Sequence, residues 1–293
     1  MSAIANLFGY VLNWLYNLVQ NYGVAIILFS VLLKIVMLPL SIKQQKSMKK
    51  SAKVQEEVNK LQVKYRNNPE MLNKEVMNLY KREKVSPFSG CLSSILQFII
   101  FISVFYLVSR PLTYMKKVDP NLINDYSNEI KESGQTTSYP EIRIIELKSA
   151  EDDRVYINMN FLGLDLSKVP LNNYKDIKVF IIPLLYVIVT FVNIKLSNNI
   201  TNKKKKEDKE KEEKAESKEL IVKDKNKEES EETLENMQQM TRSMNYTIPI
   251  MSVAIALVAP LGLSLYWFIS NVLQLLERIV VNKVVEKKQE EAN

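Results

Sequence analysis

Four long apolar runs divide this chain of 293 residues, and they constrain its fold more than any other feature. A transmembrane helix needs about twenty consecutive apolar residues, and these runs come close to that length or exceed it. The charged residues gather between the runs rather than within them. This pattern predicts an all-α membrane protein that crosses the bilayer several times. The runs are Val24–Ile42, Leu92–Val108, Val179–Ile194 and Ile248–Leu276.

Lys34 is the one charged residue inside the first run. A charge near the bilayer centre costs about 2.5–3.5 kcal/mol on insertion scales. The side chain reaches about 6 Å, whereas the run ends about 12 Å away along the helix. Lys34 therefore needs an ion-pair partner, a watery cavity or a thinned bilayer, and an intramembrane charge of this kind indicates function. A structural ion pair is the alternative, although no acidic residue lies in another apolar run.

Composition excludes several kinds of active site. The chain has no histidine and a single cysteine, Cys91, so histidine triads, histidine metal sites and cysteine clusters are absent. It has only six glycines and no phosphate-binding glycine motif. We therefore expect no enzyme, no cofactor and no metal. The net charge of +7 comes from lysines that flank the apolar runs, which is the positive-inside pattern rather than a sign of direct DNA binding.

Residues 1–21 have the pattern of an amphipathic helix that lies in the membrane interface. Apolar and aromatic side chains cover most of its surface, and Tyr10, Trp14 and Tyr16 are expected to anchor it. A first transmembrane span is the alternative. The polar stripe consists of Asn6, Asn13, Asn17, Gln20 and Asn21.

Residues 22–42 form the first predicted span, and residues 43–89 form a basic helical hairpin. The hairpin carries twelve Lys or Arg and five Asp or Glu, which places it in the cytoplasm. Asn67-Asn68-Pro69 is a turn signal between its two helices. Apolar residues define one face of each helix: Val58, Leu61 and Tyr65 on the first, and Leu72, Val76, Leu79 and Tyr80 on the second.

The second predicted span covers residues 91–109 and the third covers 177–196. Between them, residues 110–176 form an outer loop, since the segment 110–178 carries ten basic and eleven acidic residues. The sequence IRIIEL at 142–147 predicts a short strand there.

Residues 197–243 form a highly charged cytoplasmic linker that should act as a solvated spacer. The last apolar run has basic residues on both sides, so we expect two short spans, 244–259 and 262–282, and a tail at 283–293. Pro260-Leu261-Gly262 would join them near the outer surface, in contact with water. Five spans then place the N-terminus outside and the C-terminus in the cytoplasm.

Several segments resemble the YidC membrane-protein insertase family, in order along most of the chain. The resemblance is closest to the short form found in Gram-positive bacteria. The segments are NYGVAIILFSVLLKIVMLPLSIKQQKSMKK (21–50), CLSSILQF (91–98), FLGLDLSKVP (161–170), TFVNIKLS (190–197) and APLGLSLYWFISNVLQLLE (259–277).

The resemblance implies a five-span core in a bacterial plasma membrane, with a hydrophilic groove that opens to the cytoplasm and to lipid. Lys34 stands where family members usually have arginine. Gln97, Asn193, Tyr266 and Trp267 match positions that face the groove or the substrate. A helix–helix hydrogen bond is the alternative for Gln97 and Asn193, and an interfacial aromatic belt is the alternative for Tyr266 and Trp267.

The function implied is a membrane protein insertase and chaperone that is not an enzyme. Nascent membrane proteins, the ribosome and membrane lipids are its expected partners, and the Sec translocon is a further candidate. A small multi-pass transporter or channel that uses Lys34 as an anion site is the alternative from another class.

Overall fold

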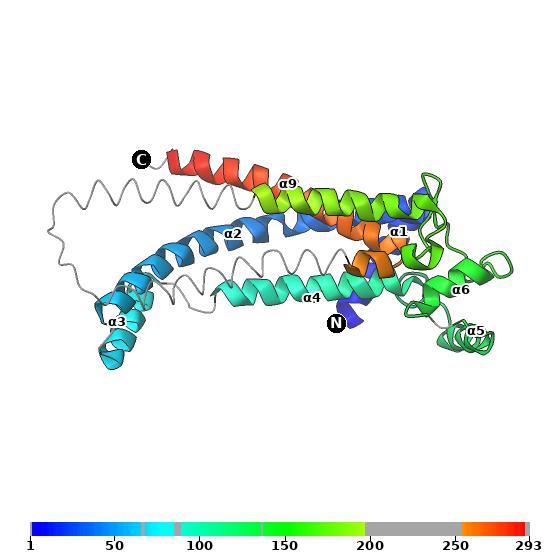
Figure 1. Cartoon of the computed structure of the whole chain (residues 1–293), viewed down its shortest axis with the longest axis horizontal. Helices are drawn as coiled ribbons and strands as arrows, with labels where there is room; N and C mark the ends of the chain where they lie inside the picture. The colour runs from blue at the N-terminus through cyan, green and yellow to red at the C-terminus, as the bar shows by residue number, and fades with distance from the viewer. Residues whose placement is uncertain (1, 66–67, 85–88, 136, 197–253, 291–293) are drawn as a thin grey trace. The chain divides into compact units, whose positions relative to one another are not determined.

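The computed structural model describes residues 2–65, 68–84, 89–135, 137–196 and 254–290, and it is mostly helical there (Figure 1). This confirms the predicted all-α class. The named elements are α1 (Ser2–Val19), α2 (Tyr22–Lys64), α3 (Pro69–Arg82), α4 (Ser89–Ser109), the π-helix η1 (Leu112–Lys116), α5 (Pro120–Glu132), α6 (Pro140–Lys148), strands β1 (Asn160–Phe161) and β2 (Leu164–Asp165), the 3-10 helices η2 (Pro170–Asn173) and η3 (Ile177–Phe180), and α9 (Leu261–Glu290). Residues 181–196 and 254–258 are also helical.

The chain forms two compact units. The first contains Met1–Ser167 and Leu276–Asn293, and the second contains Lys168–Leu275. Helix α9 contributes residues to both, because its last turns belong to the first unit. Each unit is described by itself below.

Helix α1 packs against α2, α4 and η1 in the first unit. The contact with η1 is very close: a Cβ atom on Gly9 would lie 1.9 Å from the carbonyl oxygen of Tyr114. Only glycine, which has no Cβ, permits this approach. Ala5 and Leu12 on the same face are fully buried. This buried face, with its close approach at Gly9, therefore fixes α1 against its neighbours.

The opposite face of α1 is exposed and mainly apolar. Its large exposed side chains are Leu7, Tyr10, Trp14 and Leu18. The helix was predicted correctly, but Tyr16 is not a surface anchor. Tyr16 is buried, and its hydroxyl accepts a hydrogen bond of 2.8 Å from the Asn158 backbone N–H. The i+2 and i+6 offsets of Tyr16 from Trp14 and Tyr10 turn it toward the protein.

Helix α2 is continuous over 43 residues, although it contains Pro39. The Asn21 side chain caps its start by accepting from the Val24 N–H at 3.1 Å. At 1.5 Å per residue, the helix is about 65 Å long, about twice the thickness of the hydrocarbon core. The predicted boundary at residue 42 therefore falls inside one helix, which contains both the predicted first span and the first arm of the hairpin.

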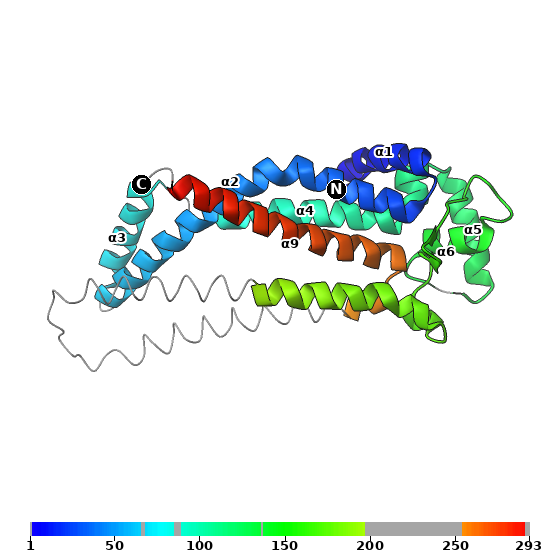
Figure 2. The same ribbon diagram turned by 90° about the horizontal axis from the view of Figure 1, so that it is seen from above.

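The predicted hairpin is present in the first unit (Figure 2). Val54, Val58 and Leu79 are buried between α2 and α3, with Leu61, Val76 and Tyr80 packed around them. The Asn68 side chain accepts from the Met71 N–H at 3.0 Å. Pro69 occupies the first turn of α3, where its missing N–H costs nothing. The turn signal was therefore predicted correctly. The predicted apolar faces are confirmed in part, because Val54 replaces Tyr65 and Leu72 in the buried cluster.

The prediction of a strand at 142–147 was wrong, since these residues belong to helix α6. Pro140 begins α6, and Ile142 and Ile145 are buried with Ile144. Positions 142 and 145 share a helical face, and Pro140 has the fixed φ that favours a first helical turn. The β1–β2 hairpin is the strand structure among the described residues, and it pairs Asn160 with Asp165 and Phe161 with Leu164.

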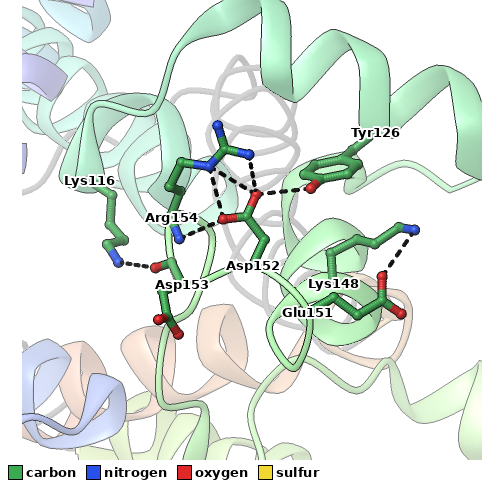
Figure 3. A network of polar contacts seen from close by, with 7 residues as sticks. All are labelled: Lys116, Tyr126, Lys148, Glu151, Asp152, Asp153 and Arg154. Atoms are coloured by element: carbon green, nitrogen blue, oxygen red, sulfur yellow. Dashed lines mark hydrogen bonds and ion pairs between the residues drawn. The ribbon is translucent and has the colours of Figure 1, made fainter.

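Polar contacts hold residues 116–156 of the first unit together (Figure 3). Asp152 accepts from Tyr126 of α5 at 2.9 Å and from the Arg154 guanidinium at 2.8 Å. The hydrogen bonds from Arg154 are the main reason that the pKa of Asp152 is well below its usual range. Lys116 of η1 donates to the carbonyl of Tyr156 at 2.9 Å. These contacts give the segment a defined structure, so it is not an open loop.

A buried carboxylate also connects α6 to η1. Glu141 accepts from the Thr113 backbone N–H at 2.9 Å and from the Thr113 hydroxyl at 2.6 Å. Burial raises the pKa of Glu141, while the hydrogen bonds from Thr113 partly oppose the shift. Glu141 thus fixes the position of η1, which is the element that α1 contacts through Gly9.

In the second unit, the chain reverses direction at Pro260. The Ser264 hydroxyl donates to the Ala256 carbonyl at 3.0 Å, although these residues would be about 12 Å apart along a straight helix. The predicted helix break is therefore present. Pro260 does not face water, since it is buried. The N–H of Leu261, which is also buried, donates to the Lys168 carbonyl at 2.9 Å.

Among the described residues, two helices are long and apolar enough to cross a membrane, Tyr22–Gln44 and Ile177–Leu196. A shorter apolar helix covers Ile95–Ser109. The predicted linker at 197–243 and most of the fourth span at 244–259 lie outside the described residues. The number of spans therefore remains a prediction.

Candidate functional site

Lys34 lies on helix α2, and its side chain is 26% exposed. The next two residues, Ile35 and Val36, are 62% and 64% exposed. Successive residues turn by about 100° around a helix, so the apolar side chains cover one side of α2 and Lys34 projects from another. The charge therefore faces the protein rather than the exposed apolar side.

Glu277 of α9 is the partner of Lys34. The Lys34 ammonium Nζ lies 2.5 Å from Glu277 Oε2, and the Glu277 side chain is only 10% exposed. Both residues belong to the first unit. Sequence reasoning missed Glu277 because it considered only acidic residues inside apolar runs, and Glu277 follows the last run directly. Its place within the predicted fifth span, 262–282, was the signal that could have found it.

This pair has two chemical consequences. Two opposite charges in a poorly solvated site attract strongly, but much of that energy offsets the cost of removing them from water. Removal of one partner alone typically costs about 3–5 kcal/mol, because the other charge is then buried without compensation. Lys34 therefore requires a carboxylate nearby, but the geometry does not require that carboxylate to be Glu277.

Gln97, the second predicted site residue in the first unit, lies on α4 and is exposed. Its neighbours Ile95 and Phe98 are also exposed, at 53% and 58%. Helix α4 packs against α2. Gln97 is thus a polar side chain in an exposed apolar surface, where it is available to a ligand.

The other three predicted site residues lie in the second unit and are buried. The Asn193 amide donates to the Asn271 carbonyl of α9 at 3.1 Å, which is the helix–helix bond considered as its alternative. Trp267 packs against Tyr186 with ring centroids 6.4 Å apart. Tyr266 is 6% exposed and Trp267 is 7% exposed, so both contribute to the packing of this unit.

Other polar residues of the apolar helices are satisfied locally. The hydroxyls of Ser30, Ser103 and Thr190 donate to the carbonyls four residues earlier, at 2.7, 2.8 and 2.8 Å. Such bonds within one helix occupy the hydroxyl donors. Within the described ranges, no group of three acidic, cysteine or histidine side chains could hold a metal ion. Lys34 and Glu277 are therefore the strongest candidate site.

A sequence model of the 60Kd inner membrane protein family matches residues 14–289. The chain is also similar to curated proteins that are each named membrane protein insertase YidC. It is 42% identical to the protein of Caldanaerobacter subterraneus subsp. tengcongensis over 108 residues, which are 37% of this chain and 52% of the relative. It is 44% identical to that of Granulibacter bethesdensis over 101 residues, 34% of this chain and 18% of the relative. Identity to that of Francisella philomiragia is 40% over 108 residues, 37% of this chain and 20% of the relative. The matches thus span between about a fifth and a half of these relatives.

Proposed function

Because this chain belongs to the 60Kd inner membrane protein family, we propose that it is a membrane protein insertase. It takes nascent membrane proteins into a hydrophilic groove centred on Lys34 and releases their spans laterally into lipid. It acts by binding and sheltering its clients, without catalytic residues, a cofactor or a metal.

The charge of Lys34 is the observation that carries this proposal. A helix of this apolar character could cross a bilayer without any charge, yet it holds a lysine beside a carboxylate 2.5 Å away. A purely structural helix would gain from an apolar residue of similar size. A basic group that tolerates a carboxylate partner is suited to acidic residues in the hydrophilic tails of client proteins.

The mechanism follows from the cost of moving a polar tail across lipid. Buried charges and unpaired backbone groups cost several kcal/mol each. A watery groove that reaches partway across the membrane shortens the apolar path, and Lys34 attracts the acidic tail into it. The apolar span of the client then moves into lipid, where burial contributes about 25 cal/mol per Å2. This gain drives the last step, so no ATP is needed.

The proposed topology has five spans, an N-terminus outside and a C-terminus in the cytoplasm. The long apolar helices at Tyr22–Gln44 and Ile177–Leu196 support it. So does the reversal at Pro260, which allows two short spans in place of one. The exposed apolar face of α1, with Trp14 at its centre, suits a helix that lies in the outer interface.

The hairpin of α2 and α3 is the proposed first contact for ribosomes and nascent chains, since its net positive charge attracts acidic partners. Exposed Gln97 is a second proposed contact with the client. Asn193, Tyr266 and Trp267 would reach a client only when helix 181–196 and α9 separate. The Sec translocon remains a candidate partner, and membrane lipids surround the spans.

The direct test is rescue of a bacterium depleted of its own insertase. Expression of the wild-type chain should restore growth and the insertion of a short client. Lys34→Arg should also restore growth and insertion, because arginine keeps the positive charge, although its planar guanidinium differs in shape from an ammonium group. Failure of the wild-type chain, with normal accumulation in the membrane, would contradict the proposal. Movement of small anions without client insertion would favour the transporter alternative.

A further inference from the structure

We propose that Glu277 is a built-in competitor of client carboxylates, and that it determines which clients gain access to Lys34. This inference rests on the proposed insertase function and identifies a second, acidic residue at the same site. The resting protein holds the lysine in an internal ion pair. An entering acidic tail must exchange places with Glu277.

The position of Glu277 supports such an exchange. Its carboxylate points toward Lys34, while its neighbours Leu276 and Ile279 are exposed on other sides of α9. In the proposed topology, Glu277 lies five residues from the end of the fifth span at 282, about 7.5 Å along the helix. The released carboxylate can therefore reach cytoplasmic water after a modest change of side-chain conformation.

The pair also explains how clients would be distinguished. A tail without acidic residues cannot open the pair cheaply, because Lys34 would lose its partner and gain none. A tail with a carboxylate exchanges one ion pair for another, so the cost nearly cancels. The internal pair thus weakens the binding of acidic tails to Lys34, whereas neutral tails, which do not bind Lys34, insert independently of Glu277.

The size of the effect follows from a pre-equilibrium. The apparent affinity of a client is reduced by the fraction of molecules in which Lys34 is available. If the pair is closed in about 90% of molecules, binding weakens by about tenfold. Glu277→Gln should remove most of this reduction for acidic tails.

The experiment measures the initial rate of insertion into vesicles that contain the full-length protein. Two model clients differ only in the tail, with one aspartate in the first and asparagine in the second. The variants are Glu277→Gln, Glu277→Asp and the double variant Lys34→Gln with Glu277→Gln. Gln274→Ala, at an exposed position on the same helix, is the matched control.

Glu277→Gln should raise the ratio of aspartate-tail to asparagine-tail insertion by about three- to tenfold at limiting client concentration. Glu277→Asp and Gln274→Ala should keep the wild-type ratio, and the double variant should show no preference. An unchanged ratio in Glu277→Gln would overturn the inference. An equal loss for both clients would do the same, because a merely structural partner predicts it. If wild-type protein inserts neither client, the proposed function itself fails.

Discussion

Gly9 of α1 lies directly against the Tyr114 carbonyl of η1, so that even a methyl group has no room between them. The obstacle is backbone, which cannot move aside as a flexible side chain could. Gly9→Ala should therefore push α1 away from η1, at a typical overpacking cost of about 1–3 kcal/mol. Thermal unfolding in detergent should show a lower midpoint. Asn17→Ala, at an exposed position of the same helix, should leave the midpoint unchanged, and equal midpoints for all three proteins would refute the contact.

Glu141 should make the contact between α6 and η1 less stable as pH rises. Burial raises its pKa in the folded protein above the ordinary value of 4.5, so the folded state binds the proton more tightly than the unfolded state. Stability is then highest below pH 4.5 and declines until the pH passes the raised pKa. Glu141→Gln should remove this pH-dependent part of the stability. Thermal midpoints of both proteins between pH 4 and 8 test it, and parallel curves would exclude a contribution from Glu141.

The apolar contact between α2 and α3 should be required for client engagement but not for the folding of the predicted spans. Val58→Asp places a charge in the small core with Val54 and Leu79, which should release α3 and expose it to protease. Ribosome-delivered clients should insert more slowly, while the spans remain resistant to digestion. Gln62→Asp, an exposed position on α2, is the control. If a Val58→Asp protein with a released α3 inserts clients normally, the hairpin only connects two segments and does not engage clients.

The predicted topology can be tested with cysteine labelling after Cys91→Ser. Lys175 is exposed and lies in the predicted outer loop, so Lys175→Cys should react with an impermeant thiol reagent added to intact cells. Asn293→Cys should react only after the membrane is opened. Leu261 is unsuitable as a reporter because it is buried. Labelling of Asn293→Cys in intact cells would indicate a single span where two short spans are predicted, and it would contradict the five-span arrangement.

Local signals in the sequence were sufficient for much of the fold. Pro69 begins helix α3 and Pro260 precedes helix α9, as expected for a residue that favours a first helical turn and disfavours a helix interior. Pro39 is the exception, because it lies inside the continuous helix α2. The apolar faces of the hairpin follow from helical spacing alone. In contrast, IRIIEL has the β-branched composition of a strand, but its isoleucines are buried in a helix that begins at Pro140. Such tertiary effects override local propensity.

The candidate site was only half predictable. Lys34 is evident because a charge in an apolar run is costly at any place in the fold. Glu277 is not evident, since its role depends on α9 passing beside α2, which local patterns do not specify. Tyr16 illustrates the same limit: its aromatic character indicates a membrane anchor, but a hydrogen bond with Asn158, distant in sequence, places it in the interior.

The most direct test of the account is the preference for acidic tails by purified protein in vesicles without other proteins. Wild-type protein and Lys34→Arg should insert the aspartate-tail client faster than the asparagine-tail client. Lys34→Gln should insert both at the same rate, because the positive charge proposed to attract the tail is then removed. The swapped variant Lys34→Glu with Glu277→Lys controls for loss of the ion pair, since it keeps opposite charges side by side. A Lys34→Gln protein that accumulates normally and still prefers the aspartate tail would show that Lys34 is not the site that receives clients.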